Sequence, residues 1–173
     1  MQNELIEYPM PLTSQTCSFA RLDVHRCMLQ DEVRRRTLED AIRQVVRPGD
    51  VVVDIGTGSG SLALTAASAG ARKVYAIEAT DLAELAESVI DHNQLGEIIT
   101  IMKGRSEDIQ LPEPVDVVLC ESLGHIVIDE GIVRTLADAH SRFSCPTTRI
   151  VPCRAQVYLA LTADPIVHQR ESL

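Results

Sequence analysis

The 173-residue sequence predicts an α/β fold in which helices flank a parallel β-sheet. Short, β-branched apolar runs alternate with longer segments of helical periodicity, which is the pattern of strand–helix–strand units with right-handed crossovers. The runs are apolar nearly throughout, as expected of parallel strands that are buried on both faces. The chain is long enough to form one domain with a core of its own.

The predicted elements follow one another from about residue 31. Helical spacing of apolar residues predicts a helix from about Asp31 that Pro48 and Gly49 end, and VVVDI (51–55) predicts a buried strand. Small residues then predict a helix that Gly70 ends. The remaining expected elements are strands at 73–78, 98–104, 115–120, 149–152 and 155–161, a helix that Asp81 caps, and a helix around 130–141 with Ile132, Val133, Leu136 and Ala137 on one face.

The composition of the chain indicates which partners it can bind and in which cellular compartment it works. The formal net charge of −9 argues against a nucleic-acid backbone and suits a cationic substrate, and an aromatic content of 3% leaves little for base stacking. We find neither a signal peptide nor an apolar stretch of membrane-spanning length, and we therefore expect no membrane partner. The five cysteines include no C-x-x-C pair, so we predict a reducing cytoplasm and no metal site.

A glycine-rich segment follows the first predicted strand. Gly56, Gly58 and Gly60 alternate there, which lets a ligand approach the backbone, and the next helix offers free N–H groups at its start. A dinucleotide-binding motif requires glycine at the sixth position, where Ser61 stands. An acid followed by G-x-G-x-G (54–60) instead resembles motif I of class I methyltransferases, which bind S-adenosylmethionine.

Acidic residues follow the next two strands. Glu78 ends the strand at 73–78, where a carboxylate can accept hydrogen bonds from ribose hydroxyls. Ser106, Glu107 and Asp108 follow the strand at 98–104, where an acid can accept from the exocyclic amine of adenine. A solvated loop with two acids fits the second group equally well.

From about His25 to Asp164 the chain resembles the catalytic core of protein arginine methyltransferases. The resemblance is carried by HRCMLQDEVR (25–34), DIGTGSG (54–60), AGARKVYAIE (69–78), IITIMKGRSEDIQLP (98–112) and ESLGHIVIDE (121–130). It implies a Rossmann-like, class I methyltransferase fold with N-terminal helices. Residues 1–24 would be a lead-in and residues 25–173 the methyltransferase domain, whose last ~20 residues would begin a C-terminal β-barrel that the chain otherwise lacks.

The resemblance also implies which residues bind S-adenosylmethionine and its product, S-adenosylhomocysteine. These are His25, Met28, Arg34, Asp54, Gly56, Thr57, Gly58, Glu78, Ser106, Glu107 and Glu121. Arg34 would pair with the methionyl carboxylate, a task suited to a planar guanidinium. Glu78 would hold the ribose, and Glu107 would meet the adenine.

Glu121 and Glu130 match the double-glutamate loop of that family and are the implied catalytic residues. A guanidinium is a poor nucleophile with five donors in a fixed geometry, so two converging carboxylates can hold its nitrogens in line with the methyl group. From their spacing alone, a polar strand end and an acid at a helix N-terminus explain the pair equally well.

The expected function is methyl transfer to a guanidino or arginine nitrogen. The expected partner is an arginine-containing peptide or protein, or a small guanidino or amine substrate. Two alternatives remain open: a small-molecule N- or O-methyltransferase, and an inactive cofactor-binding module that acts through a partner. The exposed C-terminal side leaves open a homodimer, or a partner that covers it.

Overall fold

The computed structural model describes residues 21–124, 126–127 and 129–158. Its helices are α2 (Leu22–Gln30), α3 (Glu32–Val45), α4 (Ser61–Ser68), α5 (Leu82–His92) and α6 (Ile132–Phe143), with a 3₁₀ turn η1 (Ser106–Asp108). Its strands are β1 (Val51–Ile55), β2 (Lys73–Glu78), β3 (Ile99–Lys103), β4 (Val115–Cys120) and β5 (Ser144–Val151). The predicted α/β fold is confirmed.

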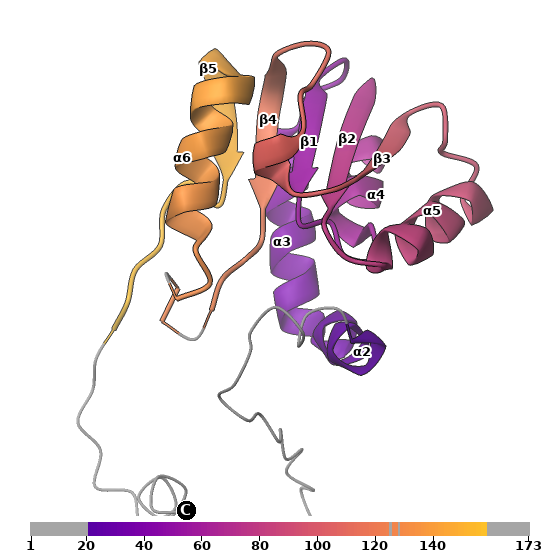
Figure 1. The fold of residues 1–173 in the computed structure, drawn as a ribbon. Helices are drawn as coiled ribbons and strands as arrows, with labels where there is room; N and C mark the ends of the chain where they lie inside the picture. The colour runs from indigo at the N-terminus through magenta and orange to yellow at the C-terminus, as the bar shows by residue number, and fades with distance from the viewer. Residues whose placement is uncertain (1–20, 125, 128, 159–173) are drawn as a thin grey trace, which may run out of the picture.

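The five strands form one parallel sheet in the order β3-β2-β1-β4-β5 (Figure 1). The chain builds outward from β1 to β3 and then crosses back to place β4 on the other side of β1. The strand order therefore reverses between β1 and β4, where Ile55 lies beside Cys120. In open α/β sheets, ligands bind outside the carboxyl ends of the strands at such a reversal.

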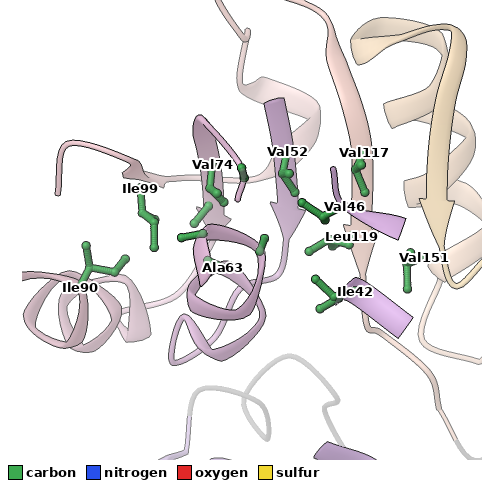
Figure 2. Packing of buried hydrophobic residues seen from close by; sticks show 14 residues of the cluster. Ile42, Val46, Val52, Ala63, Val74, Ile90, Ile99, Val117, Leu119 and Val151 are labelled. Carbon is green, nitrogen blue, oxygen red and sulfur yellow. The ribbon is translucent and has the colours of Figure 1, made fainter. Parts of the chain in front are cut away.

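Helices cover both faces of the sheet. On one face α3, α4 and α5 contribute Ile42, Ala63 and Ile90 to a cluster with Val52 and Val74 (Figure 2). On the other face, α6 packs against the alternate strand residues, such as Val51 and Val53. The core is almost wholly aliphatic, as expected of a sequence with so few aromatic residues.

The buried face of α6 differs from the prediction. Val133 is 62% exposed and Ala137 is also exposed, whereas Ala139 and Phe143 are buried together with Ile132. The helix runs two residues beyond the predicted end at 141, which brings Phe143 into the core. The face of α6 that packs against the sheet therefore carries Ile132, Ala139 and Phe143. Val133 and Ala137 lie on another face of the helix.

The end of the described chain also departs from the prediction. The fifth strand begins at Ser144, five residues before its predicted start. The sixth predicted strand, 155–161, is wrong where it can be compared: residues 155–158 are exposed and form no strand, and residues 159–161 lie outside the described part. An apolar run becomes a strand only where a neighbouring strand supplies the ladder, and residues 155–158 have no such neighbour among the described residues.

Asp81 does occupy the N-cap position of α5, but its side chain does not cap the helix. The carboxylate pairs instead with Lys103 at 2.9 Å. Thr80 Oγ1 accepts the hydrogen bond from Leu82 N, at 3.3 Å. Among the described helices, none is long and apolar enough to cross a membrane.

Candidate functional site

A cavity of about 660 Å³ opens at the carboxyl edge of the sheet, beside the β1–β4 reversal. Its volume is in the usual range for small-molecule sites. The predicted site residues that line it are His25, Met28, Arg34, Gly56, Thr57, Gly58, Glu78, Glu121 and Glu130. The two groups that the sequence analysis treated separately, the glycine-rich loop and the paired glutamates, therefore share one cavity.

The glycine-rich loop is tied to the neighbouring strand. Gly56 N and Thr57 N both donate to the carbonyl of Ile77, at 2.9 and 3.0 Å. Gly56 and Gly58 have φ angles of +73° and +57°, a left-handed conformation that side chains other than glycine rarely adopt. The sequence places glycine where this tight turn requires it.

Glu78 is buried and connects the loop to β2. Its Oε2 accepts from Gly58 N at 2.9 Å, and its Oε1 accepts from Thr80 N at 2.9 Å and Thr80 Oγ1 at 2.8 Å. A carboxylate has about four acceptor positions, so three protein donors leave one for a ligand. Sequence reasoning missed Thr80; a threonine two residues after a strand-end acid is a usual partner for a local hydrogen bond and was the available signal.

Asp54 lies beneath the loop and does not line the cavity. Its Oδ2 accepts from Thr57 Oγ1 at 2.6 Å, and its buried Oδ1 has no hydrogen-bond partner among the described residues. Burial raises the pKa of Asp54 to about 6, against the opposing hydrogen bond from Thr57. Asp54 therefore supports the turn from inside the core.

The imidazole of His25 lies against Gly58. A Cβ added to Gly58 would come within 2.5 Å of His25 Cε1, a separation that real Cβ atoms do not show. Both His25 and Met28 line the cavity from α2. Two features therefore favour glycine at position 58: the left-handed backbone conformation and the close approach of the His25 ring from α2.

Arg34 lies in the first turn of α3, where Asp31 caps the helix by accepting from Arg34 N at 3.0 Å. Its guanidinium forms an ion pair with Glu121, across 87 positions of sequence. Both side chains are only partly exposed, at 33% and 15%. Arg34 therefore connects the helix that borders the cavity to the end of β4.

The loop from Glu121 to Glu130 is tightly turned around Gly124. A Cβ at Gly124 would meet Asp129 Oδ1 at 2.0 Å, and Val127 N donates to the carbonyl of Gly124 at 3.0 Å. Val127 has a φ of +73°, which is unfavourable for a β-branched residue. These contacts fold the loop back on itself, so that Glu121 and Glu130 both reach the cavity.

Ser106 and Glu107 lie in η1, at the same edge of the sheet but not among the residues that line the cavity. The turn adjoins Glu78, because Gly104 N donates to the carbonyl of Glu78 at 2.9 Å. A hydrogen bond from its own backbone N–H is the main reason that the pKa of Glu107 lies below its usual value. Arg105 lies 3.1 Å from the same carboxylate.

Sequence reasoning missed most of the apolar lining. Leu38, Leu62 and Leu123 border the cavity, together with Ser122. Leu38 and Leu62 read as helix-core residues in the sequence, and only the tertiary arrangement shows that they also face a cavity. In the part of the chain that the structure describes, no group of three or more His, Cys, Asp or Glu side chains could hold a metal ion.

Comparisons with known proteins find methyltransferases similar to this chain. Residues 37–144 match the family model of the ribosomal protein L11 methyltransferase, PrmA. The chain is 39% identical over 158 residues to the protein arginine N-methyltransferase PRMT10 of Arabidopsis thaliana, a match that covers 90% of this chain and 41% of that protein.

Two solved structures have the same fold. The crystal structure of Arabidopsis thaliana protein arginine methyltransferase 10 superimposes with a TM-score of 0.75 and 38% identity, over 78% of this chain and 39% of that one. The Trypanosoma brucei PRMT1 enzyme–prozyme heterotetrameric complex with AdoHcy gives a TM-score of 0.73 and 32% identity, over 77% and 43%. The chain thus spans less than half the length of each of these proteins.

Proposed function

The chain belongs to the methyltransferase family that the PrmA model describes, and we propose that it transfers a methyl group from S-adenosylmethionine to a guanidino nitrogen. It also resembles the catalytic core of protein arginine methyltransferases. One observation carries the proposal. A single cavity is lined both by Gly58 and Glu78 and by Glu121 and Glu130.

The residues present fit S-adenosylmethionine. Glu78 keeps one acceptor position free beside the loop, which suits a ribose hydroxyl. Gly56 and Gly58 both line the cavity, so a ligand can approach the backbone of the loop. Arg34 supplies a guanidinium for the methionyl carboxylate and, with five donors, can keep its pairing with Glu121. Ser106 and Glu107 are proposed to meet the adenine from the adjoining turn.

When bound, S-adenosylmethionine supplies an electrophilic methyl group on a sulfonium sulfur. Glu121 and Glu130 would bind the two terminal nitrogens of the acceptor and set the attacking nitrogen in line with that group. Their negative charge would stabilise positive charge as it moves onto the acceptor. Arg34 would fix the direction of the Glu121 carboxylate, because the two side chains form an ion pair.

An arginine side chain of a peptide or protein is the proposed acceptor. Several relatives carry the names protein arginine N-methyltransferase or histone-arginine methyltransferase, and the net charge of −9 favours a cationic substrate. We also propose that a partner or a second copy of the chain lies beside its C-terminal side. The proposed location is the cytoplasm, which fits the four free cysteines of the described residues.

The test separates the cofactor from the acceptor. We expect calorimetry to detect binding of S-adenosylhomocysteine, and a labelled methyl group from S-adenosylmethionine to appear on an arginine-containing peptide. Glu121→Gln should lower that turnover by about 10²- to 10³-fold, because it removes a placed charge at the reacting nitrogen, and should change cofactor affinity far less. Glu84→Gln is the control, since Glu84 is exposed and lies outside the cavity.

Two results would contradict the proposal. Absence of S-adenosylhomocysteine binding would remove the cofactor assignment. Binding without methylation of any guanidino acceptor would favour the inactive module, and labelling of a small molecule that Glu121→Gln leaves unchanged would favour a small-molecule N- or O-methyltransferase.

A further inference from the structure

Arg142, near the C-terminal end of α6, clamps the turn that follows β3. Its Nη1 donates to the carbonyl of Ile109 at 2.6 Å, and its Nη2 donates to the carbonyl of Ser106 at 2.5 Å. These two carbonyls lie at the two ends of η1, with Glu107 and Asp108 between them. One side chain therefore fixes the whole turn from a helix more than 30 positions away.

The guanidinium is itself held in place. Asp138, one helical turn earlier, accepts from Arg142 Nε at 3.0 Å and from Nη2 at 2.5 Å, and these bonds hold the pKa of Asp138 below its usual value. The Arg142 guanidinium carbon also lies 4.4 Å from the centroid of the Phe143 ring, which is buried in the core. All three guanidinium nitrogens are thus engaged, a geometry that lysine cannot reproduce.

We propose that Arg142 is a positioning residue that sets η1 for recognition of the adenine amine. The inference rests on the proposed function. Glu107 can discriminate an amine from a carbonyl on the base only if its turn is fixed relative to Glu78, on the neighbouring strand. The Arg142 clamp fixes that turn from one side, and the backbone bond from Gly104 to Glu78 fixes it from the other.

Arg149 provides a matched control. It donates to the carbonyl of Val45 and pairs with Asp50 at 2.8 Å, so it too joins two elements through a carbonyl and a carboxylate. Its side chain is 25% exposed, against 28% for Arg142. It holds neither η1 nor any residue that lines the cavity. The variants Arg142→Lys and Arg149→Lys therefore remove similar sets of hydrogen bonds. Only Arg142→Lys removes bonds to η1, the turn that is proposed to meet the adenine.

The experiment measures two dissociation constants by calorimetry, for S-adenosylhomocysteine and for S-inosylhomocysteine, in which oxygen replaces the exocyclic amine. The wild type should prefer the adenine compound by about 10-fold or more, because the inosine compound leaves a carboxylate without its donor. Arg142→Lys should bring the ratio of the two constants close to one. Arg149→Lys should keep the wild-type ratio even where its melting temperature falls equally.

Asp138→Asn loosens the clamp without removing Arg142, and it should reduce the ratio partly; it keeps the inference testable where Arg142→Lys does not fold. An unchanged ratio in both Arg142→Lys and Asp138→Asn would overturn the inference while leaving cofactor binding, and thus the proposed function, intact. A wild type that binds both compounds equally would overturn it too. A wild type that binds neither would remove the proposed function as well.

Discussion

The glycine-rich loop with Glu78 and the loop from Glu121 to Glu130 line one cavity but are built in different ways. The first is joined to the core: Asp54 and Glu78 are 1% and 6% exposed, and three protein donors hold the Glu78 carboxylate. The second is closed by a short bridge between Gly124 and Val127, with Ile126 57% exposed. The proposed cofactor side is therefore held by buried contacts with the sheet, whereas the proposed acceptor side depends on a few local contacts.

This difference has a physical origin. The glycine-rich loop is bonded to β2 through Ile77 and Glu78, and the side chains of β1 and β2 are buried on both faces. The loop proposed to bind the acceptor follows β4 and leaves the sheet before α6 begins, and its described residues 121–124, 126–127 and 129–130 are not buried. Changes on the cofactor side should accordingly cost both stability and ligand affinity, and changes in the acceptor loop should cost little stability.

The largest effect is expected for Glu78→Gln. The amide presents one acceptor oxygen to three donors, so at least one buried donor loses its partner. We expect the free energy of unfolding to fall by about 3 kcal/mol, and affinity for S-adenosylhomocysteine to fall with it. Urea unfolding and calorimetry measure the two quantities, with Glu84→Gln as the exposed control. Loss of affinity at unchanged stability would show that the cofactor side is less preformed than described.

Asp54 should give the protein a characteristic pH dependence. Its pKa of about 6 in the folded state lies above the ordinary aspartate value of 3.8, so the folded state holds its proton more tightly than the unfolded state. Stability should therefore fall as pH rises from about 4 to about 7, by up to about 3 kcal/mol, and then level off. Unfolding curves across this range test it, and Asp54→Asn should lack this part of the slope. Equal slopes in the two proteins would contradict the prediction.

Gly58→Ala tests the contact with α2. The new methyl group would meet His25 Cε1, and alanine at a φ of +57° is strained, so we expect a loss of about 2 kcal/mol in stability. The double variant with His25→Ala removes the collision and should recover the part of that loss that does not come from the backbone. Thermal melts of the single and double variants measure the two parts. If the double variant recovers nothing, the ring does not occupy that space in solution.

The smallest effect is expected for Val127→Gly in the acceptor loop. Glycine relieves the unfavourable φ of +73° but loses more conformational freedom on folding. The two effects oppose each other, and we expect a change in stability below about 1 kcal/mol, with S-adenosylhomocysteine binding unchanged. A large loss of stability would show that this loop belongs to the core and would remove the contrast between the two sides.

Strands β1, β2 and β4 could be predicted closely from sequence, because their signals are local. Runs such as 51–55, 73–78 and 115–120 are buried on both faces, and each matches its strand in the structure. The loop glycines followed from the chemistry of close backbone approach. Each of these positions meets one local requirement, either burial or backbone conformation, and that requirement can be recognised from the residue type alone.

Other features depend on contacts between distant segments and could not be read from the sequence. Arg142 resembles an ordinary charged residue in the last turn of a helix, and only the fold shows the carbonyls that it holds. The ion pair between Arg34 and Glu121 joins positions far apart in sequence. The run 155–158 has the apolar character of a strand, yet the described structure offers it no neighbouring ladder.

The pairing of Ile55 with Cys120 has a geometric consequence for the proposed reaction. The glycine-rich loop starts one residue after Ile55, and Glu121 comes one residue after Cys120. The strand register would therefore set the separation of the proposed methyl donor and acceptor. Sliding β4 by two residues would keep every side chain on its proper face but would shift Glu121 by about 6.6 Å. Displacements of about 1 Å already slow reactions that depend on alignment by about 100-fold. Under the proposed function, the backbone ladder between β1 and β4 would therefore matter for methyl transfer as much as the two glutamates do.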